Sequence, residues 1–107
     1  MMILKGNFIV KETINNKVYK YKIIKCVLDY KGEDCIIISH LNPDFTLLLN
    51  KVSLIITEKG SPLAHLAIIA REYQKPILVV ENITNKIPKK GELSVICKNE
   101  NIEIKLC

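Results

Sequence analysis

The sequence predicts an α/β domain with a mixed sheet, and two features of the chain lead to this fold class. Three apolar runs without polar alternation, typical of strands covered on both faces, occur at residues 34–39, 52–57 and 76–80. A helical pattern lies between the second and the third run, so strand, helix and strand form a βαβ-like unit. With 107 residues the chain has the length of one domain, which we expect to span residues 1–107.

Alternating polar and apolar side chains predict an exposed hairpin at each end of the chain. The expected strands are residues 8–14 and 17–24, around Asn15-Asn16, and residues 92–98 and 102–106, around Asn99-Glu100-Asn101. Between the first two apolar runs, Asn42 as N-cap and Pro43 at the first helical position predict a short helix in residues 42–49.

The helix of the βαβ-like unit has clear start and stop signals. Ser61 is a good N-cap and Pro62 suits the first helical position, so the helix is expected to begin at Pro62. It should end near Tyr73, because Pro76 disfavours helical geometry at the residue before it. His65 then lies in the first turn of this helix.

The expected position of His65 has chemical consequences. Unpaired N–H groups at a helix start favour negative charge and disfavour an imidazolium, so the imidazole should be neutral and nucleophilic near pH 7. A phosphoryl group on its ring would lie where phosphate is favoured. Gly60 and Ser61 in the preceding loop would let the backbone approach a ligand closely and add a hydroxyl. Position alone leaves two interpretations open, a functional histidine or one that merely falls at a helix start.

Composition and charge argue against several classes of protein. No apolar run approaches the roughly 18 residues that span a bilayer, and the N-terminal segment is too short and too soon polar for a signal peptide. We therefore expect a cytoplasmic location and no membrane partner. The net charge of +5 comes from scattered lysines, with no tryptophan, which disfavours nucleic-acid binding. The four cysteines form no C-x-x-C pair and signal neither a disulfide framework nor a metal site; they are Cys26, Cys35, Cys97 and Cys107.

The segment LIITEKGSPLAHLAIIAREYQKPILVV, residues 54–80, closely resembles the phosphohistidine-bearing mobile domain of the phosphoenolpyruvate (PEP)-utilising enzymes, such as pyruvate phosphate dikinase and phosphoenolpyruvate synthase. The positions that match the family pattern are Thr57, Gly60, His65, Ala67, Ile68, Ala70, Arg71, Glu72 and Pro76. Residues 31–45 and 82–104 are similar to further segments of the family. The resemblance therefore covers nearly the whole chain from about Lys31.

This resemblance implies both a fold and a function. The domain would be a swivelling β/β/α unit with its His-bearing helix packed on a mixed sheet, and His65 would be the phosphorylated nucleophile. It would act as a stand-alone carrier, a phosphotransferase component that moves a phosphoryl group between partner domains or subunits. The nucleotide-binding and PEP- or pyruvate-binding sites, with Mg²⁺ and ATP or PEP, are expected on those partners. No cofactor or metal is expected on this domain.

The chain departs from the family pattern in the loop before the histidine. Ser61 replaces a second Gly, and Leu63 and Ala64 stand where many members have hydroxyl side chains. Ser61 or backbone N–H groups near Gly60 and Ala64 would then have to support the phosphoryl group. This departure leaves an alternative function, a catalytically silent interaction or regulatory module of the same fold.

Other polar side chains near the motif have less defined roles. Lys59 could contact phosphate or be solvated. Arg71 could hold a carboxylate or phosphate, but it points to a different side of the helix from the histidine, so a structural ion pair is expected. Glu72 and Thr57 are further structural or charge partners by their match to the family. His40, at a strand end, is expected to be a surface histidine.

Overall fold

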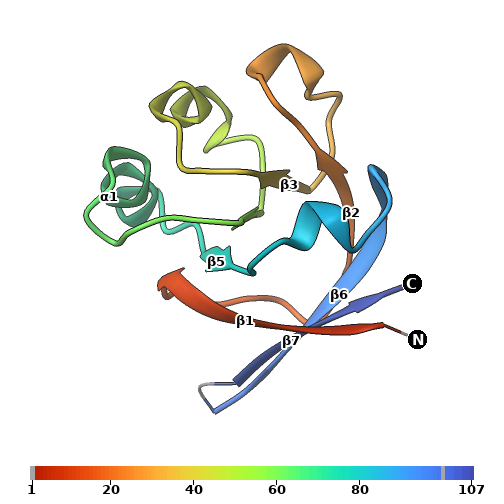
Figure 1. The fold of residues 1–107 in the computed structure, drawn as a ribbon. Helices are drawn as coiled ribbons and strands as arrows, with labels where there is room; N and C mark the ends of the chain where they lie inside the picture. The colour runs from red at the N-terminus through yellow and green to blue at the C-terminus, as the bar shows by residue number, and fades with distance from the viewer. Residues whose placement is uncertain (1, 100) are drawn as a thin grey trace.

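The computed structural model describes residues 2–99 and 101–107, and within them it shows a small mixed α/β fold, rich in strands and with one α-helix (Figure 1). The strands are β1 (Ile3–Val10), β2 (Val18–Ile23), β3 (Cys35–Ile38), β4 (Leu54–Thr57), β5 (Ile77–Val79), β6 (Lys90–Lys98) and β7 (Asn101–Leu106). The helices are the 3₁₀ helices η1 (Val27–Asp29), η2 (Pro43–Leu48) and η3 (Ile83–Asn85), and the α-helix α1 (His65–Glu72).

The strands join into a closed barrel in the order β1-β5-β4-β3-β2-β6-β7. Strands β2, β3, β4 and β5 run parallel to their neighbours in this series, and the other pairs, including β7 with β1, are antiparallel. The mixed sheet and the unit β4-α1-β5 agree with the sequence prediction. The terminal strands, however, are not exposed appendages, because they complete the barrel.

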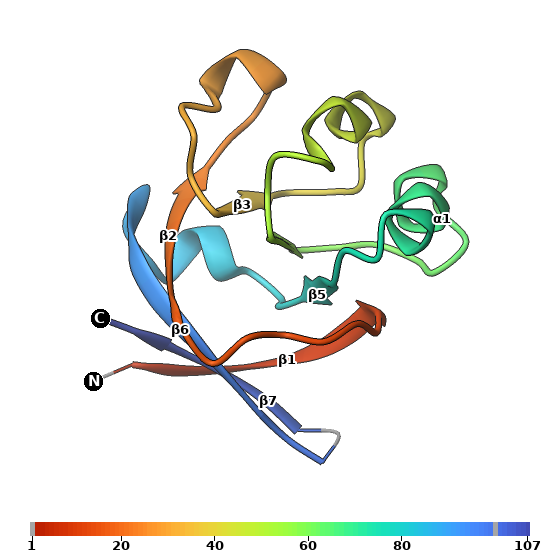
Figure 2. The same cartoon turned by 180° about the vertical axis from the view of Figure 1, so that it is seen from behind.

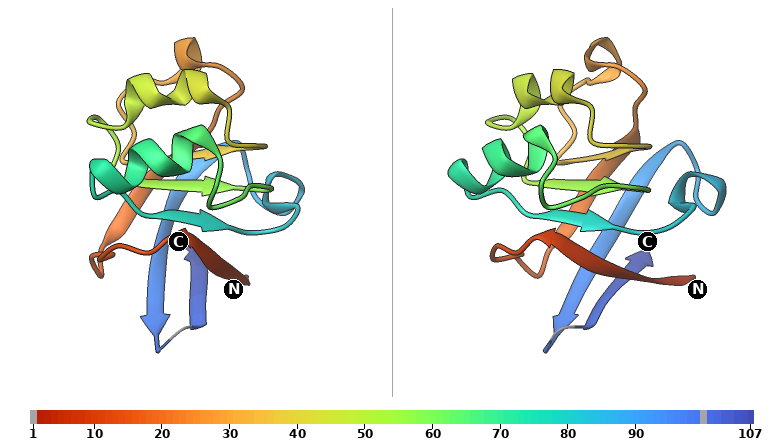
Figure 3. Two further views of the ribbon diagram at one scale, coloured as in Figure 1. Left: turned by 90° about the vertical axis from the view of Figure 1, so that its left-hand side faces the viewer. Right: turned by 60° about the vertical axis from the view of Figure 1, so that its left-hand side comes forward.

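The helical connections between the parallel strands lie on one side of the barrel. Parallel neighbours cannot be joined by a tight turn, and η1, η2 and α1 occupy the crossovers after β2, β3 and β4. Figure 3 shows these helices as a layer beside the strands, with the β6–β7 hairpin extending away from it. The two termini lie close together, since Ile3 of β1 is paired with Lys105 of β7 (Figure 2).

Two hydrophobic clusters explain the apolar runs. Successive side chains of a strand point to opposite faces, so Ile37 of β3 enters the barrel interior while Ile36 and Ile38 face the helices. All three side chains are at most 1% exposed. The cluster on the helix side includes, from α1, β4 and β5, the residues Leu66, Ala67, Ala70, Ile55 and Ile77. Burial on both faces is the reason why the central strands lack polar alternation.

The first predicted hairpin is wrong. β1 pairs with β5 and β7, whereas β2 pairs with β3 and β6. Alternating polarity indicates that one face of a strand is buried, but it does not select the partner strand. β1 also lies earlier than expected and changes partner after Gly6, where a Cβ would lie 2.8 Å from Val80 Cγ2 and 3.0 Å from the Val79 carbonyl oxygen. The close crossing at this point requires glycine.

The remaining element predictions are closer to the structure. The C-terminal hairpin is confirmed as β6–β7, although Glu100 of its expected turn lies outside the described residues. The short helix is confirmed as η2, where Asn42 Oδ1 accepts a hydrogen bond from the Asp44 N–H at 2.9 Å. The cysteines Cys26, Cys35, Cys97 and Cys107 are all free thiols. None of the helices within residues 2–99 and 101–107 has the length and apolar character that crossing a membrane requires.

Candidate functional site

His65 is the first residue of α1, which follows the carboxyl end of β4. The helix starts later than Pro62, and its N-cap is Ala64 instead of Ser61. A tight turn over residues 61–64 is the reason for this difference. The Ser61 carbonyl accepts from the Ala64 N–H at 3.0 Å, and Ser61 Oγ accepts from the Leu63 N–H at 3.1 Å. The hydroxyl therefore supports its own turn and does not cap the helix.

The loop between β4 and α1, residues 58–64, is tied to the sheet at its start. Thr57 Oγ1 donates to the Lys59 carbonyl at 2.7 Å, and the Glu58 N–H donates to the Ile38 carbonyl of β3 at 3.1 Å. Thr57 is completely buried, so its hydroxyl requires an acceptor inside the protein. The loop backbone provides that acceptor.

The middle of the loop packs closely against the core at Gly60. A Cβ at this position would lie 2.7 Å from Leu41 Cδ1 and 2.9 Å from Ile9 Cδ1. We expected this glycine to admit a ligand, but the space beside its Cα is filled by the protein's own apolar side chains. Leu41 belongs to the loop after β3, which also carries His40. The loops after β3 and β4 are therefore in contact.

Arg71 holds the last part of the loop from the far end of α1. Its Nη1 donates to the Pro62 carbonyl at 2.9 Å, across nine positions of sequence. We expected an ion pair for this arginine, and the partner that the structure gives it is a backbone carbonyl. The turn before α1 folds back toward the last turn of the helix. This geometry cannot be inferred from the spacing of residues along a straight helix. Leu63, the next residue in the turn, is 84% exposed.

The start of α1 presents free hydrogen-bond donors beside His65. The side chain of His65 is exposed, and the first helical hydrogen bond runs from the Ile68 N–H to the Ala64 carbonyl at 3.1 Å. Among the described residues, no acceptor is found for the N–H groups of His65, Leu66 and Ala67, and the N-cap Ala64 supplies none from its side chain. Such a group of N–H donors, together with the helix dipole, favours an anion.

A surface cavity of about 350 Å³ lies next to the start of the loop. Its lining residues are Glu58, Lys59, Glu81, Asn82 and Asn85. They follow β4 and β5, so the cavity lies at the carboxyl edge of two adjacent parallel strands, where α/β proteins commonly bind ligands. The residues after β5 were not predicted from the sequence to belong to the site. Their position directly behind the third apolar run was the available signal.

The other polar candidates are not brought to the start of α1. Glu72 is exposed at the opposite end of the helix from His65. His40 is exposed, and its Nδ1 lies 3.0 Å from Ser39 Oγ. Within residues 2–99 and 101–107, no group of three or more His, Cys, Asp or Glu side chains could hold a metal ion.

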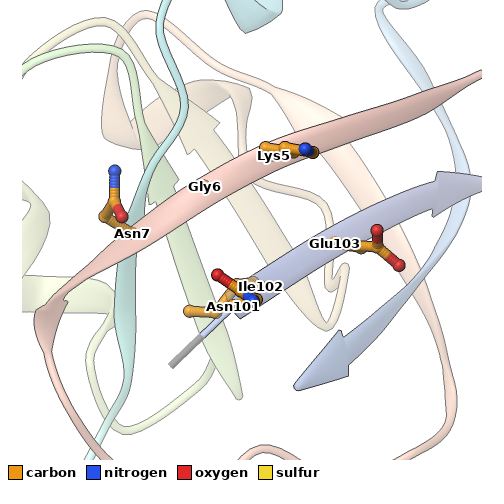
Figure 4. Close-up of a pocket in the computed structure, with 6 residues that line it drawn as sticks. All are labelled: Lys5, Gly6, Asn7, Asn101, Ile102 and Glu103. Atoms are coloured by element: carbon orange, nitrogen blue, oxygen red, sulfur yellow. The ribbon is translucent and has the colours of Figure 1, made fainter. Parts of the chain in front are cut away.

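A second cavity, of about 340 Å³, lies between β1 and β7 (Figure 4). Its lining residues are Lys5, Gly6, Asn7, Asn101, Ile102 and Glu103. None of these residues was predicted from the sequence to belong to the site.

Comparison with known proteins gives two findings. Residues 30–100 match the family model described as PEP-utilising enzyme, mobile domain. The chain is also 28% identical over 97 residues to phosphoenolpyruvate synthase of Helicobacter pylori (strain ATCC 700392 / 26695). That similarity covers 90% of this chain and 12% of the relative, so the chain spans only a small part of the length of the curated protein that it matches.

Proposed function

The chain belongs to the family of PEP-utilising enzyme mobile domains, and on that premise we propose that it is a phosphohistidine carrier of a split phosphotransferase similar to PEP synthase. In this proposal His65 accepts a phosphoryl group from one partner domain or subunit and gives it to another. Residues 1–107 move as one swivelling unit, and α1 is held on the sheet through its buried face.

The observation that carries the proposal is the environment of His65. The imidazole is exposed at the first position of α1, so a partner can approach it. The N–H groups of His65, Leu66 and Ala67 face the same end of the helix without acceptors among the described residues. A phosphoryl group attached to the ring adds negative charge where these donors and the helix dipole favour it.

The chemistry proceeds in two balanced steps. An imidazole nitrogen of His65 attacks the donor phosphorus, and the N–P bond forms while the bond from phosphorus to the leaving oxygen breaks. That oxygen keeps the electron pair. In the second step an oxygen of the acceptor attacks the same phosphorus, the N–P bond breaks, and the free imidazole returns. Donors fixed before the reaction would stabilise the charge on the phosphoryl oxygens in both steps.

The partners would supply the small-molecule sites. The chain contains no Gly-x-x-x-x-Gly-Lys sequence of the kind that cradles a nucleotide phosphate. We therefore assign the nucleotide-binding site, the PEP- or pyruvate-binding site and the Mg²⁺ ion to partner domains or subunits. We place the carrier with these partners in the cytoplasm, where ATP and PEP are available.

One specific observation favours a second candidate, a silent interaction module of the same fold. The N-cap Ala64 carries no hydroxyl, and Leu63 projects an apolar side chain that is 84% exposed. Both residues stand where many family members have hydroxyls. A module that docks on a phosphotransferase without carrying phosphate would retain the exposed leucine and would not need those hydroxyls.

The two candidates are separated by a transfer experiment with the Helicobacter pylori enzyme. The acceptor is this chain, and the donor is ³²P-labelled PEP with a version of that enzyme lacking the segment that aligns with this chain. The carrier proposal predicts an acid-labile, alkali-stable label of one phosphoryl group, about 80 Da, on the peptide that contains His65. Returned to the truncated enzyme with pyruvate, the labelled chain should pass its label on to form PEP.

Two variants make the result specific. His65→Ala should abolish the label, while the exposed His40→Ala should retain it as a matched control. A label that survives His65→Ala would contradict the assignment of the nucleophile. Binding of the wild-type chain to the truncated enzyme without any transfer between about pH 6 and 9 would support the silent module.

A further inference from the structure

The single arginine of the chain connects the turn before His65 to the end of the helix that follows it. From this connection we propose that Arg71 is a positioning residue for phosphoryl transfer at His65, a proposal that rests on the proposed function. Arg71 does not act on phosphorus itself. It fixes the turn from which the histidine and the N–H donors start.

The turn has few other attachments. Two hydrogen bonds within the turn join Ser61 to Leu63 and to Ala64. The carbonyl of Ala64 joins the helix, because it accepts from the Ile68 N–H, so for residues 61–63 the contact to Arg71 is the attachment outside the turn among the described residues. Packing holds residues 61–63 weakly as well, because they are exposed, whereas Ala64 packs against the cluster on the helix side. Gly60 anchors the chain just before the turn and Leu66 anchors it just after, since both lie against the core. The contact from Arg71 Nη1 to the Pro62 carbonyl, at 2.9 Å, therefore fixes the exposed part between them.

The residue type suits this contact. Pro62 has no N–H, so its carbonyl is the backbone group through which the turn can be held at this position. A guanidinium reaches it from the last turn of α1. Of the sixteen Lys and Arg residues of the chain, Arg71 is the one arginine. One donor to one carbonyl is a contact that a lysine ammonium can also make, which provides a conservative variant.

The expected consequence is a loss of reactivity confined to one histidine. Small displacements of a reacting group reduce transfer strongly, because the reacting atoms must be aligned. Without the contact, the turn and the N–H donors would occupy the productive arrangement for a smaller share of the time. His40 lies on a different loop, which has no hydrogen bond to Arg71 among the described residues, and it should not respond.

The experiment uses potassium phosphoramidate, a small phosphoryl donor that needs no partner protein. A ring nitrogen attacks its phosphorus, the bond from phosphorus to the amine nitrogen breaks, and ammonia leaves. Mass spectrometry at neutral pH then gives the labelling rates of His65 and His40 in the same molecule. The variants are Arg71→Met, which keeps an unbranched apolar stem without a donor, Arg71→Lys, and Lys51→Met as a matched loss of one exposed charge.

The proposal predicts that wild-type His65 is labelled faster than His40, and that Arg71→Met slows His65 by about tenfold while His40 is unchanged. Arg71→Lys should restore most of the rate, and Lys51→Met should match the wild type. Hydrogen exchange of the Leu63 and Ala64 amides gives a second measurement, and it should be faster in Arg71→Met alone. Thermal unfolding confirms that each variant is folded.

Different results overturn different statements. If His65 of the wild type reacts no faster than His40, the site has no special reactivity and the proposed function is contradicted. If wild-type His65 reacts faster and Arg71→Met leaves both its rate and the amide exchange unchanged, the positioning role is wrong while the carrier proposal stands. Faster amide exchange in Arg71→Met without a change in the His65 rate also refutes the positioning role, because the contact would then be merely structural.

Discussion

The start of α1 lacks a side-chain cap, and Ala64→Ser should supply one. Ala64 already has the extended backbone of an N-cap residue, with φ −63° and ψ 145°. Its side chain is partly exposed, so one additional oxygen can be accommodated without moving the core. The new hydroxyl would accept a hydrogen bond from the N–H of Leu66 or Ala67, which have no acceptor among the described residues.

Ser in place of Ala at an N-cap raises the free energy of unfolding by about 1 kcal/mol, within a range of roughly 0.5–2 kcal/mol. For a chain of this length, such a gain corresponds to an increase of about 4 °C in Tm. Urea titration and thermal unfolding, both followed by circular dichroism, measure it. Ala64→Val is the control, because it adds bulk at the same backbone position without adding an acceptor.

Two results would refute this reasoning. If Ala64→Ser is no more stable than Ala64→Val, the donors at the start of α1 are not available to a cap. The second test uses the protein after phosphorylation of His65. If phosphoryl oxygens occupy the same N–H groups, the stabilisation by serine should disappear in the phosphorylated form, and an undiminished gain would place the phosphoryl group elsewhere.

The other predictions concern the loop, the core and the exposed leucine. Gly60→Ala should lower the free energy of unfolding by about 1–3 kcal/mol, because the new Cβ would overlap Leu41. Urea titration measures this change, and an unchanged free energy of unfolding would show that the loop can move outward. Burial raises the pKa of the Cys35 thiol above its ordinary value of 9.0. Above pH 9 the unfolded chain therefore binds fewer protons than the native chain. Stability should therefore fall as the pH rises above 9, by up to about 1.4 kcal/mol per pH unit, and Cys35→Ala should flatten that slope in urea titrations at stepped pH. Leu63→Ser should change the free energy of unfolding by less than about 0.5 kcal/mol, since the side chain is 84% exposed. It should nevertheless reduce the rate at which the truncated Helicobacter pylori enzyme labels the chain. Equal labelling rates for the variant and the wild type would exclude Leu63 from the docking surface.

The elements that could be predicted from the sequence have local signals. Asn42 and Pro43 identify the start of η2 because an N-cap and its proline act within one turn. The apolar runs identify β3, β4 and β5 because burial on both faces requires apolar residues at every position. The prediction that His65 lies in the first turn of a helix is confirmed, although the helix begins at His65 itself and not at Pro62.

The errors arise where two solutions compete or where distant segments meet. Ser61 can cap a helix or close its own turn, and the sequence does not show which one prevails. β1 obtains its partners from β5 and β7, far along the chain, so alternation in the first thirty residues could not reveal them. Arg71 meets the Pro62 carbonyl only because the turn folds back toward the helix, which is a tertiary contact.

The contacts around His65 also bear on how a carrier could reach two partners. A histidine could travel by bending its own loop, or the whole unit could move with the loop held fixed. The Thr57 hydroxyl joins the start of the loop to β4, Gly60 packs its middle against the core, and Arg71 joins its last turn to α1. The start, the middle and the end of the loop are therefore each attached to a different part of the fold. Bending would have to break these contacts together, whereas rotation of the closed barrel breaks none of them. If His65 carries phosphate, we therefore expect the unit to move as a whole and not the loop alone.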